Sequence, residues 1–373
     1  MMESFVLSRD YPVMVLGGYG NFGARISTSL AKAGIPVIIA GRSLEKASTL
    51  AATLPQHLVS TAIFDVTQSL PEQLEQHKPA IVIHTVGPFQ TSDYSIARTC
   101  ITHGVHYIDL ADARTFVTGI TTLDSEAKKA GISIISGAST VPGLSSAVLE
   151  KYKGAFSEID TLTYGISPGQ KASRGLATAE GILTYVGKPL TPAYGTSETR
   201  YGWQDIYRQP FPELGKRWMA NCDIPDLDVL PERYGIQSIR FSAGMESTLA
   251  HLGIWALSWL VRLGIPLHLP RHARALLKAS HWLDWLGTEN GGMFMRIQGK
   301  RINGESHSIT WYIIAKNGDG PHIPTIPAIL LAKKLAMGGP LPTGAMPCVA
   351  MVPLDDYLNA LSGYAIKEYL YQE

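Results

Sequence analysis

The residues most indicative of chemistry form a glycine-rich run near the start of the chain. Gly18–Gly23 has the pattern glycine-x-glycine-x-x-glycine, after an apolar segment and before a segment with helical periodicity. In that context Gly18 permits a tight turn, Gly20 lets the backbone approach a pyrophosphate closely, and Gly23 lets the helix pack closely on the strand. The sequence therefore predicts a dinucleotide phosphate loop with these members: Gly18, Tyr19, Gly20, Asn21, Phe22 and Gly23.

The end of the next apolar run indicates which dinucleotide is bound. A site for NAD usually places a carboxylate about 20 residues after the glycines, where it accepts from the ribose 2′-hydroxyl. This chain has Arg42 and Ser43 there and no carboxylate before Glu45. A guanidinium and a hydroxyl suit a 2′-phosphate, so the sequence predicts NADP. Asp65, after the third apolar run, is either an acceptor for the adenine amine or a helix N-cap.

Two further turns are predicted to lie at the nicotinamide end of the cofactor. In an open α/β sheet, ligands bind beyond the carboxyl ends of the strands, and both turns follow apolar runs. The alternative for the first of them is a plain turn that ends a strand. The predicted contacts in the two turns are Val86, Gly87, Pro88, Phe89, Ser139 and Thr140.

Hydride transfer also requires a proton donor or acceptor close to the reacting carbon. Tyr107, Asp109 and Asp112 follow one another at the end of the fifth apolar run and are the catalytic candidates. The competing interpretation is structural: Asp112 caps the helix near Arg114, and Asp109 binds backbone.

No metal site is predicted. His103 and His106 lie three residues apart in a turn-to-strand segment, and no third ligand stands near them. Cys100, Cys222 and Cys348 are far apart, which favours a reducing compartment. Together with the absence of a signal-peptide pattern in Met1–Asp10, this predicts a cytoplasmic protein.

The elements that must position these residues alternate between strand and helix. Apolar runs at 13–16, 37–40, 62–64, 80–84, 106–110 and 132–135 predict strands, and 22–33 and 44–54 predict helices. Runs that are apolar on both faces are typical of a parallel sheet covered by helices on both sides. The expected fold class is therefore α/β, with a doubly wound Rossmann-type sheet over residues 1–146.

The remainder of the chain predicts a second domain of α+β type. Residues 147–322 contain strand patterns at 161–166, 238–242, 294–298 and 309–315 and helical patterns at 175–185 and 250–287. The apolar stretch 252–269 is too short to span a bilayer and is interpreted as a buried amphipathic helix, with an interfacial membrane contact or a dimer surface as alternatives. Residues 323–373, with a helix at 324–337, are expected to return to the first domain.

The motifs together resemble the saccharopine dehydrogenase (reductase)-like NADP-binding oxidoreductases. The matching stretches lie at 15–23, 40–43, 86–89 and 104–110. The resemblance implies a Rossmann domain, an inserted α+β domain that carries the substrate site and often a homodimer contact, and a C-terminal return. Saccharopine reductases have an Asp-Pro-Gly-type turn where this chain has 140–143 without an aspartate, so saccharopine itself is not indicated as the substrate.

Two functional hypotheses follow from these patterns. The first is an NADP(H)-dependent oxidoreductase that transfers hydride to or from a C=N, C=O or activated C=C bond of a small molecule. The second is a non-catalytic NADP-binding regulator or scaffold, because no acid or base is unambiguous. A net charge of +1 without a clustered basic excess argues against a nucleic-acid partner.

Overall fold

The computed structural model describes residues 12–173 and 175–373, and it divides the chain into two compact units. The first unit ends at Leu144 and includes Pro324–Val352 from later in the chain. The second contains Ser145–Ile323 and Pro353–Glu373. Met1–Asp10, where the sequence lacks a signal-peptide pattern, lies outside the described residues.

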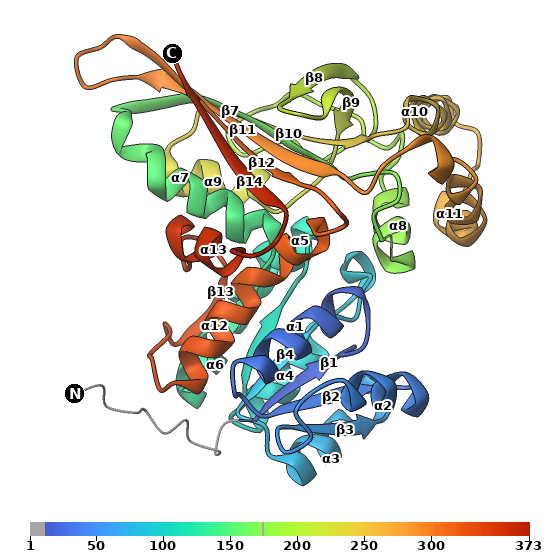
Figure 1. The fold of residues 1–373 in the computed structure, drawn as a ribbon. Helices are drawn as coiled ribbons and strands as arrows, with labels where there is room; N and C mark the ends of the chain where they lie inside the picture. Colours follow the sequence, from blue (N-terminus) through green and yellow to red (C-terminus); the bar gives the residue numbers. More distant parts are fainter. Residues whose placement is uncertain (1–11, 174) are drawn as a thin grey trace. The chain divides into compact units, whose positions relative to one another are not determined.

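The first unit is built on a seven-stranded parallel sheet (Figure 1). Its first six strands follow the doubly wound order 3-2-1-4-5-6, so the α/β fold class predicted from the sequence is confirmed. In spatial order the strands are β13 (Gly344–Pro347), β6 (Ser133–Ser136), β5 (His106–Asp109), β4 (Ile81–His84), β1 (Val13–Leu16), β2 (Val37–Gly41) and β3 (Val59–Ile63).

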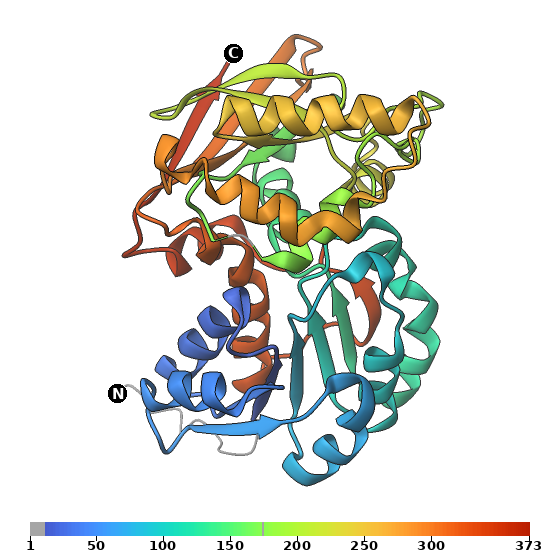
Figure 2. The ribbon, with the colours of Figure 1, turned by 90° about the vertical axis from the view of Figure 1, so that its right-hand side faces the viewer.

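Helices cover both faces of this sheet, which is why its central strands are buried throughout. Figure 2 shows α1 and α12 on one side of the sheet and the helices of residues 95–130 on the other. The helices of the unit are α1 (Asn21–Lys32), α2 (Leu44–Ala52), α3 (Val66–His77), α4 (Ser95–Thr102), α5 (Arg114–Gly119), α6 (Asp124–Ala130) and α12 (Ile326–Ala336), with shorter turns η1 (Phe89–Thr91), η2 (Ile120–Leu123) and η3 (Thr140–Leu144).

The second unit contains a mixed seven-stranded sheet. β7 and β10 pair in parallel, and the other neighbours pair antiparallel. In spatial order the strands are β14 (Ile366–Gln372), β12 (Ser306–Ala315), β11 (Gly291–Lys300), β7 (Glu158–Ser167), β10 (Ser238–Met245), β9 (Gly215–Asn221) and β8 (Tyr207–Phe211). The α+β character expected of this part of the chain is confirmed.

The helices of the second unit pack around this sheet and at one end of it. They are α7 (Ser145–Tyr152), α8 (Leu176–Leu183), α9 (Asp226–Tyr234), α10 (Thr248–Arg262), α11 (Ala273–His281) and α13 (Leu354–Ala360), with shorter turns η4 (Lys153–Ala155), η5 (Leu269–His272) and η6 (Asp284–Leu286); η7 (Gly320–Thr325) precedes α12.

The C-terminal part of the chain differs from the expected return over residues 323–373. Pro324–Val352 lies in the first unit, where β13 extends the parallel sheet beside β6. Pro353–Glu373 lies in the second unit, because β14 pairs with β12 at the edge of the mixed sheet. β14 is largely exposed and contains Lys367 and Glu368, which suits a strand at the edge of a sheet.

Candidate functional site

The loop between β1 and α1 has the geometry of a phosphate-binding turn, but its glycines have different tasks from those expected. The left-handed residue is Gly17, with φ 74°, and not Gly18, to which the sequence analysis gave the tight turn. Gly18 instead lies against the sheet, where a Cβ atom would stand 2.8 Å from the Val15 carbonyl oxygen and 3.2 Å from the Ile39 Cα. Both positions therefore exclude a side chain, one through conformation and one through contact.

The start of α1 provides the cradle itself. Gly23 is buried in the first turn of the helix, and a Cβ atom there would overlap the Gly17 carbonyl. Gly20 is the N-cap, is exposed, and makes no side-chain cap hydrogen bond. Asn21 and Phe22 follow, both partly exposed. A helix N-terminus that no side chain caps, preceded by glycines at 17, 18 and 20, can accept a pyrophosphate, so the loop fits the predicted dinucleotide.

Tyr19 connects this loop to the end of β2. Its hydroxyl accepts a hydrogen bond from the Ser43 backbone N–H at 2.8 Å, and its ring lies over Gly41, where a Cβ atom would clash with it. Ser43 is the N-cap of α2 and accepts from the Lys46 backbone N–H at 3.3 Å. Arg42 lies between these residues and is exposed. The Arg42 guanidinium is therefore exposed at the carboxyl end of β2, next to Ser43, which Tyr19 of the phosphate loop holds in place.

Asp65 takes the capping role, one of the two roles that the sequence left open. Its Oδ1 accepts from the Thr67 backbone N–H at 3.0 Å and from the Thr67 hydroxyl at 2.7 Å, at the start of α3. The hydroxyl bond, followed by the backbone bond, lowers the pKa of this carboxyl. Contact with an adenine amine stays a prediction.

The loop after β4 presents backbone and hides an aromatic ring. The Thr85 hydroxyl donates to the Leu16 carbonyl at 2.8 Å and fixes this loop to the end of β1. Val86 is 39% exposed, and Gly87 and Pro88 are partly exposed, so these residues are accessible to a ligand. Phe89 is buried against Phe116, with ring centroids 5.3 Å apart. Its side chain is therefore part of the core, which leaves only its backbone for the predicted cofactor contact.

Two of the three catalytic candidates are buried within a polar network on one face of the sheet. Tyr107 is 1% exposed and Asp109 is 0% exposed. The Tyr107 hydroxyl lies 2.9 Å from His84 Nδ1, and burial together with the Asp109 charge raises the pKa of Tyr107 well above its usual value. Burial also lowers the pKa of His84 to about 4, so its imidazole is neutral near pH 7.

Asp109 connects the loops that follow β5 and β6. Its Oδ1 accepts from the Ala111 N–H at 2.9 Å, the Ser136 hydroxyl at 2.9 Å and the Gly137 N–H at 2.8 Å. Its buried Oδ2 has no hydrogen-bond partner among the described residues. Burial raises the pKa of Asp109 to about 6 in spite of these bonds. This geometry favours the backbone-binding interpretation, in which Asp109 positions loops and does not touch substrate.

Asp112 is the catalytic candidate with access to solvent. It is partly exposed in the loop between β5 and α5, and Gln90 Nε2 donates to its Oδ1 at 3.1 Å. Burial raises the pKa of this carboxyl, and the Gln90 bond opposes that shift. Asp112 does not cap α5, whose N-cap is Ala113 without a side-chain bond, so the capping alternative is wrong for this residue.

The remaining loop follows β6. Ser139 and Thr140 are partly exposed there, whereas the residues on either side of them are buried. Both hydroxyl residues lie beyond the carboxyl end of a central strand, on the same edge of the sheet as the Asp112 loop and the loop after β4. These three loops and the phosphate loop form the candidate site of the first unit.

The histidines noticed in the sequence have partners within the protein. His103 Nδ1 lies 2.8 Å from the Thr99 carbonyl oxygen, and His106 Nδ1 accepts from the Ser133 N–H at 3.0 Å. Within residues 12–173 and 175–373, no group of three or more His, Cys, Asp or Glu side chains could hold a metal ion.

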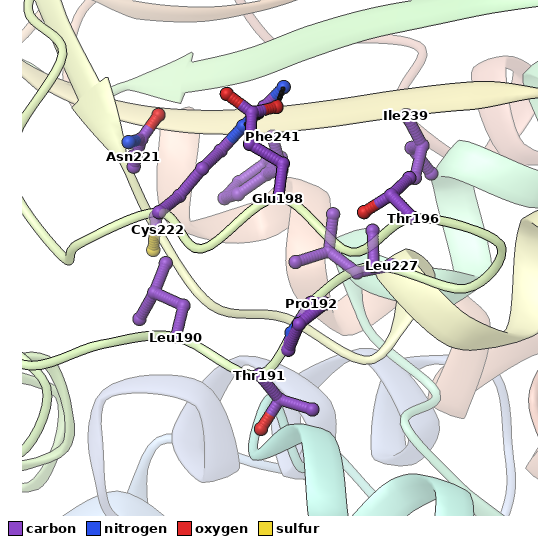
Figure 3. Close-up of a pocket in the computed structure, with 12 residues that line it drawn as sticks. Leu190, Thr191, Pro192, Thr196, Glu198, Asn221, Cys222, Leu227, Ile239 and Phe241 are labelled. Atoms are coloured by element: carbon purple, nitrogen blue, oxygen red, sulfur yellow. Dashed lines mark hydrogen bonds and ion pairs between the residues drawn. The ribbon is translucent and has the colours of Figure 1, made fainter.

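A separate pocket lies wholly within the second unit (Figure 3). It encloses about 410 Å³, including its open mouth, between the segment 190–200, β9, β10 and α9. The Glu198 and Arg200 side chains at its edge form an ion pair of 2.9 Å, and Cys222 lies close to the Tyr185 hydroxyl at 2.8 Å. Its lining is largely apolar, and none of the predicted site residues contributes to it.

Most of the first unit matches a known domain family. Residues 13–135 match the saccharopine dehydrogenase NADP binding domain, so the resemblance predicted from the sequence is confirmed. No curated protein sequence matches the chain.

A solved structure resembles the chain over nearly its whole length. Apo histidine-tagged saccharopine dehydrogenase (L-Glu forming) from Saccharomyces cerevisiae superposes with a TM-score of 0.64 at 14% identity, over 97% of this chain and 100% of that one. Amine dehydrogenase from Mycobacterium smegmatis superposes with a TM-score of 0.49 at 15% identity, over 92% and 96%. The first of these similarities shows a shared fold.

Proposed function

We propose that this chain is an NADP(H)-dependent oxidoreductase that transfers hydride to or from a C=N, C=O or activated C=C bond of a small molecule. The observation that carries the proposal is the pairing of the uncapped glycine cradle before α1 with an exposed Arg42 at the end of β2. The first binds a pyrophosphate, and the second suits a 2′-phosphate. The match of residues 13–135 to an NADP-binding domain family supports the same cofactor. Homodimerisation and a cytoplasmic location stay predictions.

Each part of the site has a task in this proposal. A nicotinamide cofactor held by the phosphate loop and Arg42 would supply the hydride-transfer chemistry. The loops after β4 and β6 would orient it through Val86, Gly87 and Thr140. Asp112 would exchange the proton, because it is the only partly exposed residue among the three candidates. Tyr107 and Asp109 would act through the loops as positioning residues.

Substitution of Arg42 tests the cofactor. Arg42→Ala removes a charge-assisted contact worth about 1.5 to 3 kcal/mol, so the Kd for NADPH is expected to rise roughly 10- to 150-fold. The Kd for NADH is expected to stay unchanged, because NADH has no 2′-phosphate. Fluorescence titration with each cofactor measures both constants. Lys32→Ala, at the exposed far end of α1, is the matched control and should leave both unchanged. Equal or absent binding of the two cofactors would contradict the proposal.

Substitution of Asp112 tests the chemistry. Asp112→Asn keeps the size of the side chain and its bond from Gln90 but cannot exchange a proton, so kcat is expected to fall about 100-fold with little change in the Kd for NADPH. The assay is NADPH oxidation with panels of imines, ketones and enoyl compounds. In this direction Asp112 donates the proton, so activity is expected to fall as pH rises through its pKa. Gln90→Ala should move that fall to higher pH, since the Gln90 bond lowers the pKa of Asp112.

A second candidate function is a non-catalytic NADP-binding regulator. It is favoured by the burial of Tyr107 and Asp109, which leaves one carboxylate for acid–base chemistry. The same assays separate the two functions. Tight NADPH binding that depends on Arg42, combined with no turnover across the panels, supports the regulator. Turnover that depends on Asp112 supports the oxidoreductase.

A further inference from the structure

The second unit exposes an apolar helix face. α10 is largely apolar, yet only His251 and Ser258 are buried among its residues. Five residues at helical spacing form an exposed stripe without a charge. Of these, Leu249 is 65% exposed and Leu263 is 73% exposed. The stripe consists of Leu249, Gly253, Ala256, Leu260 and Leu263.

The segment around α11 exposes a second stripe, of a different kind. Its members are spaced three and four residues apart: Arg271, Arg274, Lys278, Trp282 and Trp285. Arg274 and Lys278 lie four apart on one side of α11. Arg271 lies in η5 before the helix, Trp282 is the C-cap, and Trp285 lies in η6 after it. All five are exposed, and the two indoles are 75% and 76% exposed. Among the described residues, the three cations make no ion pair.

The two stripes lie at the same end of the second unit. Figures 1 and 2 both show α10 and α11 next to each other, on the face of the unit that Figure 2 turns toward the viewer. We call the two stripes together the α10–α11 surface. Between Thr248 and Leu286 the only carboxylate is Asp284, and it already binds His281 at 2.8 Å and Gln170 at 3.0 Å. The surface is therefore apolar, rich in tryptophan and positively charged.

We propose that the α10–α11 surface binds the interface of an anionic lipid bilayer. Tryptophan side chains favour the headgroup level, and helices that lie in the interface combine an apolar face with basic residues. Arg271, Arg274 and Lys278 would pair with lipid phosphates while Leu263 and the indoles enter the acyl boundary. Within the described residues no helix is both long enough and apolar enough to cross a bilayer, so the contact is with one leaflet.

A second copy of the chain fits this surface less well. In a two-fold symmetric pair the same patch meets itself, so the three cations would approach their own counterparts. No free carboxylate on the surface would compensate them, and like charges facing each other across an interface oppose association. An anionic membrane supplies the missing negative charge.

Vesicle flotation with the full-length protein tests the proposal. We expect flotation with phosphatidylcholine vesicles that contain phosphatidylserine, weaker flotation with phosphatidylcholine alone, and a decrease at high salt. Arg271→Gln combined with Arg274→Gln should lower the partition coefficient about 30-fold. Trp282→Ser combined with Trp285→Ser should lower it at least as much and abolish the blue shift of tryptophan fluorescence on binding.

The matched controls are substitutions of the same kind at exposed residues of the second unit outside the α10–α11 surface. Lys216→Gln with Lys367→Gln removes two exposed cations, and Ile302→Ser removes an apolar side chain that is 87% exposed. Both controls should float like the wild type, and circular dichroism should show every variant folded. The proposal is overturned by three results: no flotation with either vesicle, flotation that neither double variant reduces, or a dimer in sedimentation that Leu263→Glu dissociates without any vesicle binding.

Discussion

Gly23→Val is expected to abolish NADPH binding, with a Kd at least about 100-fold higher, and to lower the free energy of unfolding by about 3 kcal/mol. Gly23 lies in the first turn of α1, where a Cβ atom would overlap the carbonyl of Gly17 and stand 2.9 Å from the Gly18 Cα. These neighbours are backbone atoms and cannot rotate away as a side chain would. Relief of the clash must therefore move the loop or the start of α1, and both hold the pyrophosphate in the proposed site.

Two control variants separate the loss of binding from the loss of stability. Gly20→Ala adds a Cβ atom 3.1 Å from the Gly17 carbonyl oxygen at an exposed position, so it should weaken NADPH binding with a small effect on unfolding. Gly154→Ala, with no atom within 4 Å of its Cβ atom, should change neither. Denaturant unfolding and fluorescence titration measure the two effects. Wild-type NADPH affinity in Gly23→Val would show that the cofactor does not use this loop.

The phosphate loop was predictable because its parts are neighbours in the sequence. A strand, a glycine turn and a helix within about twenty residues leave few alternative geometries, so the fold of the first unit followed from its pattern. The pattern did not predict whether Gly17 or Gly18 makes the turn, because two adjacent glycines both accept a positive φ. Only the contact of Gly18 with β1 and β2 decides which one turns the chain.

The polar network around Asp109 could not be seen in the sequence. His84, Tyr107 and Ser136 come from three strands that only the parallel register brings together. A histidine such as His84 at the end of an apolar run does not reveal its hydrogen-bond partner. The i, i+2 relation of Tyr107 and Asp109 is the one signal that these two share a face of the sheet. Their burial depends on the helices that cover that face, which spacing alone does not reveal.

The second unit was predicted in outline only. β7, β10, β11 and β12 follow apolar patterns, whereas β8 contains Pro210 and β14 contains the adjacent charged residues Lys367 and Glu368. Both of these strands lie at the edges of the sheet, where a proline and charged side chains are tolerated. Their sequences therefore resemble loops, and only pairing with β9 and β12 makes them strands.

Asp109→Ala is expected to lower the free energy of unfolding by about 4 kcal/mol, because it leaves two buried N–H groups and one hydroxyl without their acceptor. The loops after β5 and β6 would lose their common anchor, so NADPH binding and turnover should fall as well. Asp109→Asn is the matched variant: an amide oxygen can accept the same three bonds without the charge. It should keep the fold and most of the NADPH affinity.

The pH dependence of stability distinguishes a buried charge from a simple hydrogen-bond acceptor. The pKa of Asp109 is raised from 3.8 to about 6 in the folded protein, so the folded state binds this proton more tightly than the unfolded state. Wild-type stability therefore falls as pH rises through the window from 3.8 to 6, by about 3 kcal/mol for this group. The amide of the Asp109→Asn variant has no such proton, so this variant should gain about 3 kcal/mol on the wild type between about pH 4 and pH 7.

Comparing the stability of the wild type with that of Asp109→Asn separates the effect of Asp109 from that of the buried histidines. The pKa values of His84 and His251 are both lowered to about 4 by burial, so these residues make the folded protein less stable as pH falls below 6.5. This histidine effect changes stability with pH in the opposite direction to the Asp109 effect. It is the same in the wild type and in Asp109→Asn, so it cancels in the difference between their unfolding free energies. Unfolding in denaturant at about pH 4, 5, 6 and 7 gives the comparison. A difference in stability that stays constant with pH would mean that Asp109 is ionised without penalty, and its carboxylate would then behave as an ordinary solvated group.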